Sequence, residues 1–113
     1  MVKIMKIKIH NDVWKVKLVD ANAKKMNPDP NSYNFGLTEY KELLISIMDG
    51  RSESVTRSTL IHELVHAFLF SYGHTVEGEE AMCDFFGVHR DEIIDLTNQI
   101  MGRWGDRCLQ SKK

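Results

Sequence analysis

Hydrophobic and polar residues alternate at the start of the chain. Ile7 and Ile9 alternate with lysines, and Trp14, Val16 and Leu18 alternate with further lysines. A period of two residues places all the apolar side chains on one face of a β-strand. The pattern predicts a hairpin over the first twenty residues, with its turn in the sequence HND and its lysines on the solvated face.

The middle of the chain changes character twice. Segment 27–36 holds both prolines and shows no periodicity, which predicts a surface loop. Segment 41–49 is largely apolar and ends at Asp49-Gly50, which predicts a third strand. We expect residues 42–48 of this strand to form the sheet edge beside a cleft, where an extended peptide could add as another strand.

The second half of the chain has a helical period. Apolar residues of segment 56–72 fall on one stripe, and Gly73 follows as a stop signal; they are Leu60, Ile61, Leu64, Val65, Phe68 and Leu69. A second helical stretch begins near Glu77 and runs to Trp104, with Gly87 as a point where it could divide. The order of elements predicts one α+β domain over 1–113, with helices on one face of a small three-stranded antiparallel sheet.

Length and charge exclude several classes of protein. The 113 residues suit a single domain, and 15 Lys+Arg against 16 Asp+Glu lack the basic bias of a nucleic-acid binder. The start of the chain has neither the apolar core of a signal peptide nor a membrane span. We therefore expect a cytoplasmic protein with no nucleic-acid or membrane partner. Cys83 and Cys108 lack a CxxC spacing, so free, mostly buried thiols are expected.

The sequence TLIHELVHAF places polar groups within this apolar helix. His62 and His66 are four residues apart, so both imidazoles lie on one helix face and can reach one ion. Neutral imidazoles suit zinc, and the adjacent Glu63 suits the general base that activates a water. The spacing is the HExxH pattern of zinc metallopeptidases. The alternative, two hydrogen-bonded core histidines, requires a chance match that is uncommon at this composition.

Catalytic zinc commonly has three protein ligands, so a third is expected downstream. Glu80 and Asp84 are spaced i, i+4, which puts a metal-binding carboxylate and a supporting acid on one helix face. Glu80 is the predicted ligand because only from that register does the i+4 position hold an acid. The less favoured candidates are His74 and Cys83 near the metal and Tyr33, Tyr40 and Tyr72 for an oxyanion; His10 and His89 are expected on the surface.

HELVHAF followed by EAMCDFFG resembles the gluzincin peptidases, and most of all the compact ImmA/IrrE-type family and related small phage metallopeptidases. The resemblance spans roughly residues 36 to 88. It implies that His62, His66 and Glu80 bind zinc, that Glu63 is the base and that Asp84 orients His62. It also implies a bacterial or phage setting and protein substrates such as regulatory proteins.

Two functions from different classes follow. The first is a zinc-dependent endopeptidase that hydrolyses a peptide bond with an activated water. The second is a catalytically silent, zinc-stabilised module that binds a partner protein. Glu63 discriminates between them, because a structural metal site needs only its ligands. A DNA-binding regulator is a poorer third hypothesis, given the charge balance.

Overall fold

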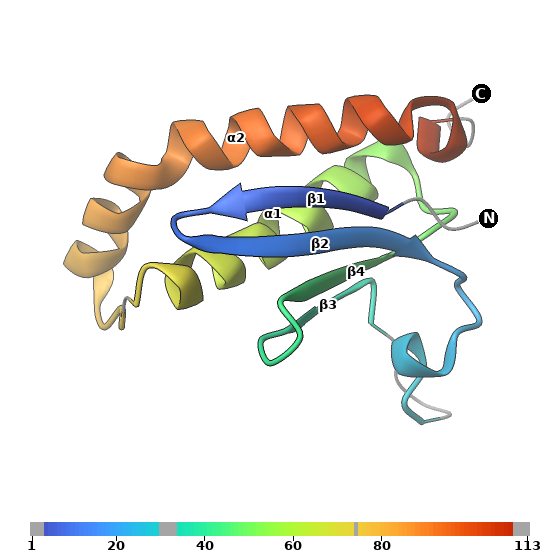
Figure 1. The fold of residues 1–113 in the computed structure, drawn as a ribbon, viewed down its shortest axis with the longest axis horizontal. Coiled ribbons are helices and arrows are strands. Elements are labelled where there is room, and N and C mark those ends of the chain that lie inside the picture. Colours follow the sequence, from blue (N-terminus) through green and yellow to red (C-terminus); the bar gives the residue numbers. More distant parts are fainter. Residues whose placement is uncertain (1–3, 30–33, 74, 110–113) are drawn as a thin grey trace.

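The fold combines one sheet with two long helices (Figure 1). The computed structural model describes residues 4–29, 34–73 and 75–109, with side chains as far as residue 105. In chain order the elements are β1 (Ile4–Ile9), β2 (Asp12–Val19), the short 3-10 helix η1 (Lys24–Met26), β3 (Gly36–Glu39), β4 (Leu44–Met48), α1 (Glu53–Ser71) and α2 (Glu79–Leu109). The expected α+β class is confirmed.

Within the described residues the sheet has four strands in the order β1-β2-β4-β3, so the prediction of three antiparallel strands was wrong. β1 and β2 form the expected antiparallel hairpin, but β2 pairs with β4 in parallel and β3 pairs with β4 antiparallel. The additional strand, β3, begins at the end of the predicted loop. Its four residues are all half-buried, and their sequence GLTE shows no clear alternation that would predict a strand.

The position of β4 corrects a second expectation. Residues 42–48 were predicted to form the sheet edge, whereas β4 lies between β2 and β3. Four of its five residues are buried, with Ile45 and Ile47 in the main core. A strand buried on both faces belongs in the sheet interior, which agrees with its nearly continuous apolar sequence. The edge nearest to β4 is therefore β3.

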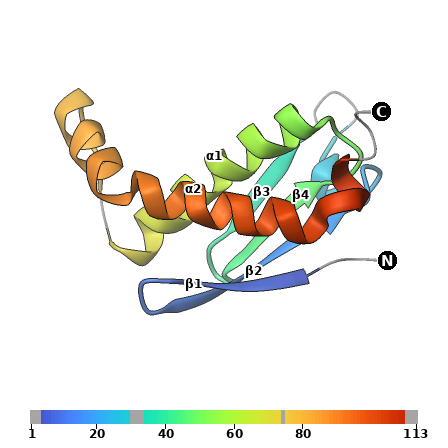
Figure 2. The ribbon, with the colours of Figure 1, turned by 90° about the horizontal axis from the view of Figure 1, so that it is seen from above.

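Both helices contribute to one core on a single face of the sheet. α1 lies across that face, and α2 runs alongside α1 near the β1 edge (Figures 1 and 2). The core joins the inward side chains of the hairpin to both helices; its largest members include Trp14, Leu18, Ile45, Leu60, Leu64, Phe68, Ile93, Ile100 and Trp104. The alternation of apolar residues in the hairpin is thus confirmed as an inward-facing set.

Local signals set the ends of the helices. Ser52 caps α1, since its hydroxyl accepts a hydrogen bond from the backbone N–H of Val55 at 3.3 Å, so the helix begins three residues before the predicted 56. Gly73 follows with φ 69°, a conformation that favours glycine. α2 continues through Gly87 without a break and departs from helical geometry only at Gly105. In the described part of the chain, neither helix is long and apolar enough to cross a membrane.

Candidate functional site

The middle of α1 carries the three polar residues of the HExxH motif. Leu60 and Leu64 are fully buried against the core and fix the rotation of the helix. Both histidines therefore lie on the side of α1 that points away from the core, where His62 is exposed and His66 is half-buried. Their ring centroids lie 4.9 Å apart, so the structure brings the two imidazoles together as the i, i+4 spacing predicts.

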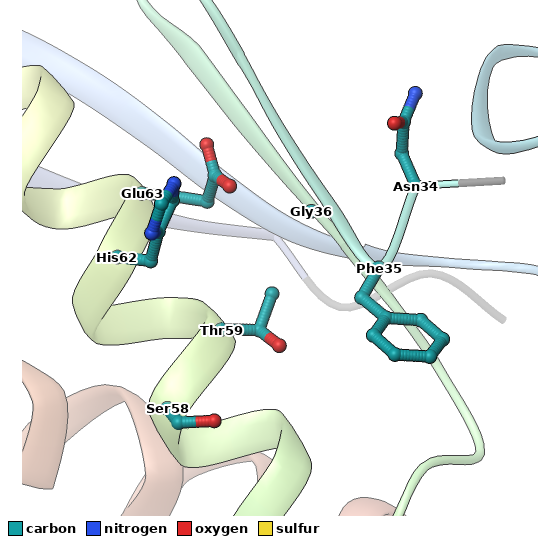
Figure 3. A pocket seen from close by; sticks show the side chains of 7 residues that line it. All are labelled: Asn34, Phe35, Gly36, Ser58, Thr59, His62 and Glu63. Atoms are coloured by element: carbon teal, nitrogen blue, oxygen red, sulfur yellow. The ribbon is translucent and has the colours of Figure 1, made fainter.

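The Glu63 side chain points toward β3, the strand that begins at Gly36 (Figure 3). Only 7% of its surface is exposed, an uncommon degree of burial for a carboxylate. The hydroxyl of Thr38, on β3, donates a hydrogen bond of 2.5 Å to its Oε1. A buried carboxylate requires hydrogen-bond donors, and the Thr38 hydroxyl is one. This contact holds the acid between the helix and the edge strand.

Gly36 allows β3 to pass this close to α1. A Cβ at this position would lie 2.7 Å from Thr59 Cγ2, 2.9 Å from Glu63 Cγ and 3.0 Å from Glu63 Oε2. The first two separations are too short for carbon atoms in contact. Any side chain here would displace the edge strand or the carboxylate, so glycine is required by the space and not by its backbone conformation.

Two hollows flank the motif. One of about 440 Å³ is lined by both His62 and Glu63, and by Asn34, Phe35 and Gly36 from the segment that enters β3 (Figure 3). The other, of about 460 Å³, lies between α1 and the first turns of α2; it is lined by His62, His66, Ser58 and the apolar side chains of Ile61, Val65, Leu69, Met82 and Phe86. His62 borders both hollows, so a group bound beside it would be accessible from either.

Substituting Gly36 with alanine should destabilise the protein by about 1–3 kcal/mol, the usual effect of overpacking. The added methyl group would press on Thr59 and Glu63. Urea unfolding measures the change. Gly102→Ala is the matched control, since no atom lies within 4 Å of its Cβ position in α2, and alanine there should stabilise the helix by up to about 1 kcal/mol. Equal stability of the two variants would show that β3 does not approach α1 so closely.

The structure does not bring Glu80 and Asp84 to the histidines. Both are exposed in the first turns of α2. Asp84 lines a separate hollow together with Phe85 and His89, whereas Met82 and Phe86 face His62 and His66. Glu80 and Asp84 lie on the other side of the helix from Met82 and Phe86, since α-helical residues advance by about 100° each.

Glu79, in contrast, lies on the side of α2 that faces the histidines. At about 100° per residue it is roughly 40° from the mean direction of Met82 and Phe86, and Glu80 is roughly 140° away. Glu79 begins α2 and is exposed. Sequence spacing and helix orientation therefore select different carboxylates for a third ligand.

A zinc ion fits the donor chemistry of the two histidines. Paired imidazoles on one helix face, bordering a common hollow, are a typical part of a zinc site. Within the described residues, no three His, Cys, Asp or Glu side chains are close enough together to hold a metal. The site thus has two candidate ligands in place and needs a third. The first turn of α2 holds two acids, Glu79 and Glu80, and the same helix borders the hollow beside the histidines.

The remaining candidates from the sequence lie elsewhere. His74 and Tyr33 fall outside the described residues. Tyr72 stacks on the ring of His10, at 4.5 Å between centroids, at the far end of α1. Cys83 is exposed, so the expectation of a buried thiol was wrong for it.

His89 corrects another expectation. It is only 5% exposed, although the sequence predicted a surface residue. Its ring packs against three aromatic rings, those of Phe68, Tyr72 and Phe85, with centroid separations of 5.7 Å, 4.4 Å and 4.9 Å. The packing of α2 on α1 encloses this side chain, which a local sequence pattern cannot reveal.

Two residues of the site were not found from the sequence, Thr38 and Gly36. Both lie in the short strand β3, and they contact the motif only because the strand passes beside α1. A glycine two residues before a threonine is an ordinary pattern, so nothing local distinguished them.

Comparison with known proteins adds no neighbour: the chain matches no protein-family model, and no curated protein and no solved structure shows significant similarity to it.

Proposed function

We propose that the protein is a zinc-dependent endopeptidase of the HExxH type. One observation carries the proposal: the Glu63 carboxylate, buried and hydrogen-bonded to Thr38, shares a hollow with the first histidine of the motif. A base must be fixed near the ion that activates its water, and these two side chains come from adjacent positions of one helix. The resemblance of HELVHAF and EAMCDFFG to gluzincins supports the same reaction.

The chemistry assigns one role to each side chain. His62 and His66 would hold zinc, which when bound supplies a Lewis acid that polarises the scissile carbonyl and acidifies water. Glu63 accepts the proton of the attacking water and later delivers it to the leaving amine. Its low exposure limits competing solvent around the carboxylate, which favours a directed proton transfer.

The surroundings of the motif suit an extended peptide. β3 is an edge strand, so one side of its backbone has no strand partner among the described residues. An extended chain can bind such an edge through main-chain hydrogen bonds, with little dependence on sequence. The apolar hollow beside His66 could accept a large hydrophobic side chain of the same peptide. We therefore propose unstructured or locally unfolded protein segments as the substrate class.

We propose Glu80 as the third ligand on the sequence spacing alone, because an acid follows it at i+4. In the orientation of α2 described above, Glu80 points away from the histidines, so this ligand requires the first turn of α2 to reorient when zinc binds. We expect Glu80→Gln to reduce zinc affinity strongly. Loss of one anionic ligand weakens binding of a dication. Asp84→Ala should reduce zinc affinity by roughly 10–100-fold, the usual effect of removing the partner of a ligand. Competition with a fluorescent zinc chelator gives the affinities, and both variants alter exposed side chains, so the fold should persist.

Glu79→Gln is the matched variant for this test. It removes the same charge from the same turn, but at a position on the same side of α2 as Met82 and Phe86. If Glu79→Gln lost the zinc and Glu80→Gln kept it, the helix orientation seen here would hold in the metal-bound protein, and Glu79 would be the ligand.

The rival function is a zinc-stabilised interaction module without turnover. It predicts metal binding but no hydrolysis. Metal analysis of the purified protein, paired with a cleavage screen on a peptide library, separates the two: zinc together with cleavage supports the peptidase, and zinc without any cleavage supports the module.

A further inference from the structure

The Glu63 carboxylate contacts residues outside the HExxH motif, on strand β3. Its two carboxylate oxygens have different surroundings. Oε1 accepts the 2.5 Å hydrogen bond from the Thr38 hydroxyl, and the same hydroxyl oxygen lies 3.4 Å from the backbone oxygen of Glu63. The shorter contact to the charged oxygen is the stronger one. One oxygen of the base is thus engaged by the edge strand.

The second oxygen lies over Gly36. The Cβ that glycine lacks would be 3.0 Å from Oε2, so the absence of a side chain at Gly36 makes room for this oxygen. Gly36 and Thr38 are two residues apart on β3 and therefore point to the same face of the strand. One face of the strand thus holds Oε1 with a hydroxyl and leaves space for Oε2. Gly36 and Glu63 both line the hollow that His62 borders.

We propose that Thr38 is a positioning residue for Glu63: its hydroxyl holds Oε1 and so presents Oε2 to the hollow beside His62. The inference rests on the proposed function, because it assigns to Thr38 the orientation of the general base. Thr38 acts through Glu63 and needs no contact with the reacting atoms. Without the hydroxyl, the buried carboxylate would lack its donor on β3 and would rotate toward other donors or water.

Three substitutions separate this role from a general effect on stability. Thr38→Val keeps the shape and removes the hydroxyl, and Thr38→Ser keeps the hydroxyl. Thr97→Val is the matched control, since Thr97 is fully buried in α2 and its hydroxyl donates a hydrogen bond of 2.8 Å to the backbone oxygen of Ile93. It removes a hydrogen-bonded hydroxyl from a threonine that does not contact Glu63.

The first readout needs neither metal nor substrate. The ¹³Cδ resonance of Glu63 in the metal-free, isotopically labelled protein is identified by its loss in Glu63→Gln. Thr38→Val should shift this resonance, whereas Thr38→Ser and Thr97→Val should leave it in place. An unshifted resonance in a folded Thr38→Val protein would overturn the inference.

The second readout is turnover of a quenched fluorescent peptide library by the zinc-loaded protein. Thr38→Val should lower kcat by about 10-fold or more, the value of one hydrogen bond to a charged group, with KM and zinc content unchanged. Thr38→Ser should restore most of kcat. Full kcat in Thr38→Val would overturn the inference. If the wild-type protein cleaved no peptide, the proposed function would fail, and the resonance of Glu63 would still decide whether Thr38 holds its carboxylate.

Discussion

Glu63→Gln is expected to reduce peptide hydrolysis by about 10²–10⁴-fold while the zinc content stays the same. Glutamine has the shape of glutamate and its amide oxygen can still accept the hydrogen bond from Thr38, so the packing between α1 and β3 should persist. It cannot accept a proton from water at neutral pH, so the base is lost and the ligands are kept. Initial rates on a cleaved library peptide, together with elemental analysis for zinc, measure both quantities.

The control for this experiment is Glu92→Gln, which removes the same charge from an exposed position of α2. Its rate should equal that of the wild-type protein. Hydrolysis that survives in Glu63→Gln would contradict the assignment of the base, and parallel loss of zinc would show that Glu63 contributes to binding the ion.

His62→Ala and His66→Ala are each expected to abolish stoichiometric zinc binding and, with it, hydrolysis. Each removes one of the two imidazoles whose rings lie 4.9 Å apart. Zinc bound only to the folded state raises stability by about 2.7 kcal/mol at one hundred times its dissociation constant. In a small domain, each kcal/mol of added stability raises the thermal midpoint by roughly 4–8 °C, so zinc should raise the midpoint measurably. Both variants should lose this zinc-dependent rise.

The metal-free proteins supply the control. His62 is exposed, so without zinc the free energy of unfolding of His62→Ala should lie within about 0.5 kcal/mol of the wild-type value. The difference between variants must therefore appear only when zinc is added to a calorimetric or fluorescence unfolding scan. A variant that kept one zinc per chain would show that the ion binds elsewhere.

The sequence by itself determined the features that depend on neighbouring residues. Alternation with a period of two predicted the β1–β2 hairpin, and the apolar stripe predicted α1 with its stop at Gly73. The i, i+4 spacing placed His62 and His66 on one helix face, because helical geometry alone sets their separation. These patterns join residues that are close together in the chain, so they can be recognised without the tertiary structure.

Tertiary structure decided the features that join distant segments. β2 pairs with β4 in parallel, and β3 is added as the edge strand. Both features depend on where the chain crosses the sheet, and no periodic pattern in the sequence indicates them. The same crossing placed Thr38 and Gly36 against Glu63.

The rotation of α2 was decided in the same way. Its core residues, among them Phe85 and Ile93, must pack inward, and this buries His89 and leaves Glu80 and Asp84 exposed. An i, i+4 spacing shows that two acids share a helix face, but the direction of that face depends on which apolar side chains the rest of the protein can bury.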